Sequence, residues 1–221
     1  MPRAAPAVTA GSIGAVVPPV GDSVLTDSDS PSFASFPDLE RDALACQKCA
    51  LAQGRTQVVF GVGDPSADLM FVGEGPGEQE DLQGIPFVGR AGQLLTRLIE
   101  GIGLTRDEVY IANVVKCRPP GNRDPLPGEI EECSPYLEAQ LRFIDPAVVV
   151  TLGNFATKLL LDTKEGITKL RGKEFPFRER AVLMPTFHPS AVLRNGGPAL
   201  AQARADFVRV KRALARKRAP A

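Results

Sequence analysis

The sequence predicts an α/β fold, a three-layer αβα sandwich built around a central sheet of four parallel strands. Four short runs of apolar residues are typical of strands buried on both faces of a sheet, and they cover residues 69–73, 109–114, 147–152 and 181–185. Segments with helical periodicity separate these runs. Because strands that alternate with helices are joined by crossover connections, the pattern favours parallel pairing with helices on both faces.

The helical segments differ in how clearly the sequence defines them. The clearest covers residues 91–102, where apolar side chains recur on one face. A second is expected at about 127–143, disturbed at Pro135, and a third at about 155–161. A short helix at 39–45 and a last helix at the carboxyl end complete the expected elements.

Length and composition predict one folded domain without membrane contact. A chain of 221 residues with 43% hydrophobic residues can build one packed domain, which we expect to span residues 36–221. Residues 1–35 are rich in Ala, Pro, Gly and Ser, and a disordered leader is expected there. The 26 basic and 26 acidic side chains cancel, so any site for a polyanion must be local. No apolar run reaches the roughly 18 residues of a membrane span and no signal peptide is evident, so we expect a cytoplasmic protein.

Polar residues follow the predicted strands at the ends where ligands gather in parallel α/β sheets. These residues are Glu74, Asn113, Gly153 and His188. The glycine-rich turn after the first strand is not typical of a dinucleotide site, because Pro76 interrupts it and no acidic residue follows at the expected spacing. An amide both donates and accepts, so Asn113 is a candidate for reading a base edge, and His188 is the only histidine. Taken one at a time, a turn-capping asparagine and an incidental loop histidine are the alternatives.

Four cysteines form a candidate metal site, and they are Cys46, Cys49, Cys117 and Cys133. A chain without an export signal keeps its thiols reduced, which favours metal or redox use over disulfides. Four thiolates suit either tetrahedral zinc or a 4Fe-4S cluster, and the spacing alone does not separate the two. Unligated cysteines in the core are the remaining alternative.

Five motifs together resemble family 4 of the uracil-DNA glycosylase superfamily. They are residues 73–77 (GEGPG), 80–81 (ED), 86–92 (PFVGRAG), 113–120 (NVVKCRPP) and 188–190 (HPS). Their order and the four cysteines agree with that family over about residues 38–212. The resemblance implies a four-stranded parallel sheet between helices and a 4Fe-4S cluster held by the four cysteines. It also implies an enzyme that flips uracil out of single- or double-stranded DNA and hydrolyses its N-glycosidic bond, leaving an abasic site.

The resemblance also implies how the base is bound. Phe87 would stack on the flipped uracil, next to Gly75, and Asn113 would donate to the 4-carbonyl of the base while accepting from its ring NH. Cytosine presents the reverse pattern, and a site that leaves buried polar groups unpaired rejects the wrong base. His188 would face the 2-carbonyl, where negative charge develops as the glycosidic bond breaks.

Two acidic residues are candidates for contact with the attacking water. Glu74 is the expected water-positioning residue, and Glu80 is its rival. Some members of the superfamily have an aromatic residue near position 77 that excludes the thymine methyl group. Because Gly77 cannot do this, Glu80 is expected to take that role.

Contacts with DNA are expected around the same loops. Extruding a base from a duplex is commonly assisted by an apolar wedge, which we expect at Ala191, Val192 and Leu193. Contacts with the DNA backbone are expected from hydroxyl, arginine and loop positions, namely Gly89, Arg90, Gly153, Ser190 and Arg194. The basic residues within 209–218 add either affinity for DNA or a solvated helix face.

Two other classes of function stay open at this point. A relative in the superfamily traps uracil-DNA irreversibly with a histidine in an inserted basic segment, but this chain has a single histidine and no such insertion at residues 119–127. A four-cysteine metal module that binds nucleic acid without catalysis would make His188 and Asn113 structural. The expectation is the glycosylase, acting on uracil-containing DNA as a monomer.

Overall fold

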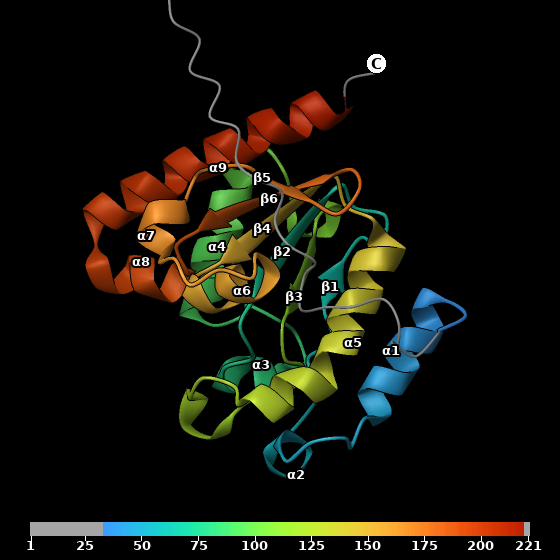
Figure 1. The fold of residues 1–221 in the computed structure, drawn as a ribbon. Helices are drawn as coiled ribbons and strands as arrows, with labels where there is room; N and C mark the ends of the chain where they lie inside the picture. The colour runs from blue at the N-terminus through green and yellow to red at the C-terminus, as the bar shows by residue number, and fades with distance from the viewer. Residues whose placement is uncertain (1–32, 219–221) are drawn as a thin grey trace, which may run out of the picture.

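A six-stranded sheet lies at the centre of the computed structural model, which describes residues 33–218 (Figure 1). Its strands are β1 (Val62–Gly63), β2 (Leu69–Gly73), β3 (Tyr110–Asn113), β4 (Val148–Leu152), β5 (Phe175–Phe177) and β6 (Ala181–Thr186). They lie in the order β1-β3-β2-β4-β6-β5. The four predicted strands are β2, β3, β4 and β6, and they pair in parallel, which confirms the α/β fold class.

The sheet has two more strands than the sequence predicts. Both extra strands, β1 and β5, pair antiparallel at the edges of the parallel centre. β1 has two residues and includes Gly63, and β5 has three residues and includes Pro176. Neither segment contains an apolar run long enough to indicate a strand, and proline is tolerated at a sheet edge because no ladder bond is lost there. The prediction of four strands therefore holds only for the parallel centre.

Helices cover both faces of the sheet. They are α1 (Phe36–Ala45), α2 (Leu51–Gly54), α3 (Glu78–Gln83), α4 (Arg90–Glu100), α5 (Pro127–Ile144), α6 (Asn154–Leu160), α7 (Ile167–Leu170), α8 (Pro189–Asn195) and α9 (Gly197–Arg218), with 3-10 turns η1 (Arg106–Glu108) and η2 (Pro120–Asn122). α4, α8 and α9 pack on one face and α1, α5 and α6 on the other (Figure 1). Among the described helices, none has both the length and the apolar composition needed to cross a membrane.

The folded part begins slightly earlier than the sequence predicts. Of the expected leader at 1–35, residues 1–32 lie outside the described part of the chain. Ser35 caps α1 by accepting a hydrogen bond from the Asp38 amide at 3.3 Å. The ring of Phe33 packs against Tyr136 with centroids 6.1 Å apart. These two residues therefore belong to the fold.

The helix α5 runs through Pro135 without a break, although a disturbance is expected there. Proline has no N–H, so the carbonyl of Glu131, one turn earlier, loses its helical partner. The Ser134 hydroxyl donates to that carbonyl at 3.1 Å. This local bond replaces the missing one and lets the helix continue.

The carboxyl ends of the parallel strands meet at one edge of the sheet. In the register, Gly73 pairs with Asn113 and Leu152 pairs with Thr186, and each of these residues ends its strand. The core fixes this edge, since Phe71 in β2 stacks on Phe207 in α9 with ring centroids 5.6 Å apart. The residues that follow the four strands are therefore held close together.

Candidate active site

A cavity of 680 Å³ opens at the carboxyl edge of the sheet. The residues predicted from the strand ends all line it, and they are Glu74, Asn113, Gly153 and His188. Most other predicted site residues line it as well, namely Gly75, Glu80, Phe87, Gly89, Arg90, Ser190 and Arg194. This volume lies within the range that is usual for small-molecule sites, about 300–1,000 Å³.

Asn113 and Phe87 form one wall of this cavity. The Asn113 side chain is buried, and its Oδ1 has no hydrogen-bond partner among the described residues. Both side chains crowd Gly73, where an added Cβ would collide with Asn113 Oδ1 and lie 2.5 Å from the tip of the Phe87 ring. An unpaired buried acceptor is costly, so this oxygen is suited to a ligand that donates.

His188 lies beside Phe87, with ring centroids 5.7 Å apart. Its Nδ1 accepts from the Ser190 amide at 3.2 Å and lies 2.7 Å from the Ser190 hydroxyl. Burial and the charge of Arg194 lower the pKa of His188 to about 4. The ring is therefore neutral at pH 7, and because Nδ1 is an acceptor, the proton is assigned to Nε2.

Gly153 sets the position of His188 through its backbone. It has a φ of 93°, and an added Cβ would lie 2.9 Å from the Cβ of His188. Its N–H donates to the carbonyl of Thr186 at 2.9 Å. This bond links the ends of β4 and β6 and places the histidine loop over the sheet edge.

Glu74 lies in the wall of the cavity, close to Asp124. Burial, together with the charge of Asp124 and a hydrogen bond to it, raises the pKa of Glu74 to about 7. Asp124 itself is exposed and comes from the loop before α5. The sequence gives no signal for this pair, because 50 residues separate its members along the chain.

Glu80 uses both of its carboxylate oxygens to hold neighbouring loops. Oε1 accepts from the amides of Val88 and Gly89 at 2.9 and 3.0 Å, and Oε2 accepts from the Gly77 amide at 3.1 Å. These bonds join the turn before α3 to the loop that carries Phe87. A carboxylate bonded to three amides is fixed in place and has little capacity left for a water molecule.

The rim predicted for DNA contact needs three corrections. Val192 is 2% exposed and packs into the core. Of Val192 and Leu193, only Leu193, which is 41% exposed, projects into solvent as a wedge would. The amides of Gly89 and Gly153, expected to bind phosphate, donate to Glu80 and Thr186 instead. The helix phase and these long-range bonds are not visible in a local sequence pattern.

Two arginines of the basic last helix form ion pairs with acidic residues of the same chain. Arg216 pairs with Glu174 at 2.6 Å and Arg218 pairs with Asp68 at 2.7 Å. Arg90 and Arg194 at the mouth of the cavity are exposed. These two arginines therefore place positive charge at the mouth of the cavity.

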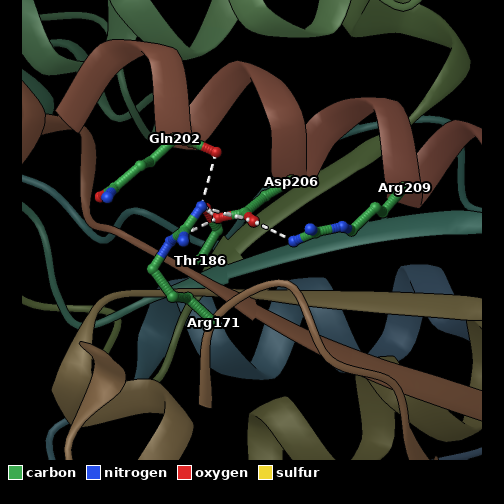
Figure 2. A network of polar contacts seen from close by, with 5 residues as sticks. All are labelled: Arg171, Thr186, Gln202, Asp206 and Arg209. Atoms are coloured by element: carbon green, nitrogen blue, oxygen red, sulfur yellow. Dashed lines mark hydrogen bonds and ion pairs between the residues drawn. The ribbon is translucent and has the colours of Figure 1, made fainter. Parts of the chain in front are cut away.

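A buried carboxylate of α9, Asp206, bonds to Thr186 at the end of β6, two residues before His188 (Figure 2). Asp206 in α9 is 1% exposed and accepts from the Thr186 hydroxyl at 2.8 Å. It also accepts from Arg171 at 2.7 and 3.0 Å and from Arg209 at 3.3 Å. The Arg171 guanidinium lies 5.0 Å from the centre of the Phe187 ring, next to His188. The sequence does not indicate this network, whose members come from three separate elements.

The four cysteines lie together, away from the cavity. They line one pocket between α1, α2 and α5, and all four thiols are free. An Arg55 guanidinium N–H donates to Sγ of Cys117 and the Lys116 amide donates to Sγ of Cys133, both at 3.2 Å. Two of the four sulfurs therefore already accept a hydrogen bond from the protein.

Burial affects the protonation of two of these thiols. Burial raises the pKa of Cys133 to about 12 and also raises that of Cys117. Such buried thiols become thiolates when a metal supplies the compensating charge. Within residues 33–218, no three potential ligands lie close enough together to hold one metal ion. The donor set fits a metal centre with four thiolate ligands.

Comparisons with known proteins agree with the geometry. A family model described as the uracil DNA glycosylase superfamily matches residues 60–214, more than half of the chain. The type-4 uracil-DNA glycosylase of Sulfurisphaera tokodaii is 49% identical over 169 residues, which cover 73% of this chain and 77% of that protein. The type-4 enzyme of Thermotoga maritima is 50% identical over 151 residues, covering 68% and 79%. The type-5 enzyme of Pyrobaculum aerophilum is 30% identical over 163 residues, covering 66% and 72%.

Proposed function

Because the chain belongs to the uracil-DNA glycosylase superfamily, we propose that it excises uracil from DNA by hydrolysing the N-glycosidic bond and leaves an abasic site. The observation that carries the proposal is the buried, unpaired Oδ1 of Asn113, which faces the cavity beside the Phe87 ring. Uracil offers a ring N–H to such an acceptor. Its neighbouring 4-carbonyl accepts from the amide nitrogen of the same side chain.

The base lies flat on Phe87 in this proposal, with Asn113 at its edge and Gly75 along the same wall. Cytosine places a donor where uracil has the 4-carbonyl and an acceptor where uracil has the ring N–H. It would leave the asparagine unpaired on both sides, which rejects it strongly.

The imidazole of His188 acts at the 2-carbonyl, on the other side of the ring N–H from the 4-carbonyl. As a neutral ring with its proton on Nε2, it donates to the 2-carbonyl of uracil. Negative charge grows on that oxygen as the glycosidic bond breaks, so the hydrogen bond strengthens in the transition state. The Ser190 amide at Nδ1 keeps the ring in the required tautomer.

Glu74 holds the water that attacks the sugar carbon. Its carboxylate form accepts a hydrogen bond from the water and places negative charge near the positively charged sugar that forms. Glu80 has a different role, since its three amide bonds make it a positioning residue for the Phe87 loop. Exclusion of thymine by Glu80 stays a prediction.

The pH dependence of excision tests the role of Glu74. Because its pKa is raised to about 7, the carboxylate is lost as the pH falls below 7, and the rate constant should fall with it. His188 stays neutral over this range and adds no limb. Single-turnover rate constants from pH 5 to 9 should show one acidic limb in the wild type. The limb should be absent in Glu74→Gln, which stays slow throughout.

Asp124→Asn is the matched variant for this experiment. It removes the neighbouring negative charge, so the pKa of Glu74 should fall and the limb should move to lower pH. If the rate constant of Glu74→Gln fell at acidic pH as that of the wild type does, the titrating group would not be Glu74, and Glu74 would not have this role.

The DNA lies across the mouth of the cavity. Leu193 enters the stack where the uracil leaves it, and Arg90, Ser190 and Arg194 contact the phosphates on either side. Because the pocket takes an extruded base, both single- and double-stranded DNA are substrates, and a single chain provides the whole site. We include a monomeric state in the proposal.

The four cysteines hold a 4Fe-4S cluster in this proposal. Bound there, the cluster would cross-link the turn between α1 and α2, the loop after β3 and the helix α5, which is a structural contribution. Replacing Cys133 by Ala should remove the visible absorbance and most of the iron, and should lower the urea midpoint of unfolding. Iron and zinc content, measured with the absorbance spectrum, check this result. A colourless wild-type protein that contains zinc would contradict the cluster.

A strand-cleavage assay tests the activity itself. Wild type and His188→Ala are incubated with oligonucleotides that carry one uracil, one thymine or one cytosine, and abasic sites are cleaved with alkali. We expect cleavage by the wild type only at uracil, with release of free uracil over many turnovers. Absence of cleavage at uracil, in protein with a full complement of iron, would rule out the proposed activity.

A further inference from the structure

Arg106 lies behind the wall of the cavity and bonds to the loop that carries Phe87. Its guanidinium donates to the carbonyl of Pro86 at 2.8 Å and to the carbonyl of Phe87 at 3.2 Å. A third bond, at 3.3 Å, reaches the hydroxyl of Thr96 in α4. One side chain from η1 therefore grips two consecutive carbonyls 19 and 20 residues earlier in the chain.

Arg106 has no ion-pair partner among the described residues, although its side chain is half-buried. Burial lowers its pKa, and the charge of the adjacent Asp107 opposes this only in part. Placing a cation among neutral acceptors has a desolvation cost. The compensation comes from the three hydrogen bonds that it donates.

The gripped segment has an unusual backbone. Phe87 has a φ of 54°, in the left-handed region that residues other than glycine rarely adopt. Its carbonyl packs so closely against Gly92 that an added Cβ there would collide with it. Glu80 holds the next two amides of the loop from the other side. Arg106 thus binds the carbonyls of the two peptides that flank the Cα of Phe87, and Glu80 binds the two amides that follow Phe87.

We propose that Arg106 is a positioning residue for catalysis, which holds the Phe87 peptide in its left-handed conformation so that the ring lies against Asn113 and His188. The inference rests on the proposed function, since the ring matters only if a base stacks on it. Without the two carbonyl bonds, the backbone of Phe87 relaxes toward the common region. Its ring then moves out of the plane that the base needs.

A purely structural role for Arg106 makes a different prediction. If it only ties η1 to α4, its loss lowers stability and affects excision equally whether or not the Phe87 ring is present. If it acts through Phe87, its loss has no further effect once that ring has been removed. A double-mutant cycle in excision activity separates the two cases.

The experiment compares wild type, Arg106→Ala, Phe87→Ala and the double variant in single-turnover excision of uracil, with urea unfolding of each. We expect Arg106→Ala to lower the rate constant by about 10- to 100-fold, as misplacement of a substrate-positioning group does. In the Phe87→Ala background, the same change should alter the rate constant by less than about twofold, because the effects are coupled. Arg142→Ala, an exposed arginine in α5, serves as the control and should match the wild type.

Arg106→Lys keeps the charge and the apolar stem, and it covers the case in which Arg106→Ala does not fold. A lysine ammonium lacks the planar pair of N–H donors that lets Arg106 bind two carbonyls at once. We therefore expect the rate constant to fall less than in Arg106→Ala, and not to fall in the Phe87→Ala background. Equal losses with and without the Phe87 ring, or wild-type activity of Arg106→Ala, would overturn the inference. If the wild type itself does not excise uracil, it is the proposed function that fails.

Discussion

Asn113→Ala should lower uracil excision by about two to three orders of magnitude, as the loss of one well-placed transition-state donor does. The same variant should be at least as stable as the wild type. In the wild type, the buried Oδ1 of Asn113 has no hydrogen-bond partner among the described residues, and burying such a group costs about 1–3 kcal/mol. Loss of activity without loss of stability is the expected result of removing a group that is kept for a ligand.

Single-turnover kinetics and urea unfolding measure the two quantities. Asn113→Asp is the isosteric comparison, and it should be about as inactive on uracil because a carboxylate cannot donate to the 4-carbonyl. Gln202→Ala removes an exposed amide from α9 and should leave both quantities unchanged. An Asn113→Ala protein that keeps more than about a tenth of the activity would mean that this amide does not bind the base.

The parts of the site that the sequence predicts are those determined by local pattern. Long apolar runs define β2, β3, β4 and β6, and the rule that ligands gather after parallel strands then identifies Glu74, Asn113 and His188. The edge strands β1 and β5 escape prediction because two or three residues with a glycine or proline carry no periodicity.

The supporting residues could not be predicted, because each acts over a long separation in sequence. Arg106 stands in a polar segment that has the pattern of an ordinary helix start, and its target carbonyls have no sequence signal at all. The prediction that Val192 is a wedge beside Leu193 is wrong for a different reason. Successive positions on a helix point in directions about 100° apart, so only one of the two faces solvent.

The buried Asp206 network leads to the largest expected effect on stability. Asp206→Ala removes the acceptor for Arg171, whose side chain is only 15% exposed, and leaves that charge without its carboxylate. Breaking a buried ion pair by removing one partner costs about 3–5 kcal/mol. We expect a loss of this size in the free energy of unfolding, measured in urea. By contrast, Arg209→Ala should cost less than about 1 kcal/mol, because Arg209 is half exposed.

Removing both partners should cost much less than removing Asp206 alone. Burial raises the pKa of Asp206 more than the Thr186 hydroxyl and the two arginines lower it, so the network offsets only part of the desolvation cost. A double variant with Asp206→Leu and Arg171→Met replaces the pair by apolar groups, which is often neutral for stability. Its free energy of unfolding should lie closer to the wild type than to Asp206→Ala.

The same double variant separates stability from support of the histidine loop. It lacks the guanidinium that lies over Phe187, and it lacks the carboxylate that holds Thr186, the last residue of β6. If the network also positions His188, the double variant excises uracil more slowly than the wild type even though its free energy of unfolding is close to that of the wild type. If excision recovers together with stability, the network contributes only to the fold, and the loop needs no more than the bonds of Gly153 and Ser190.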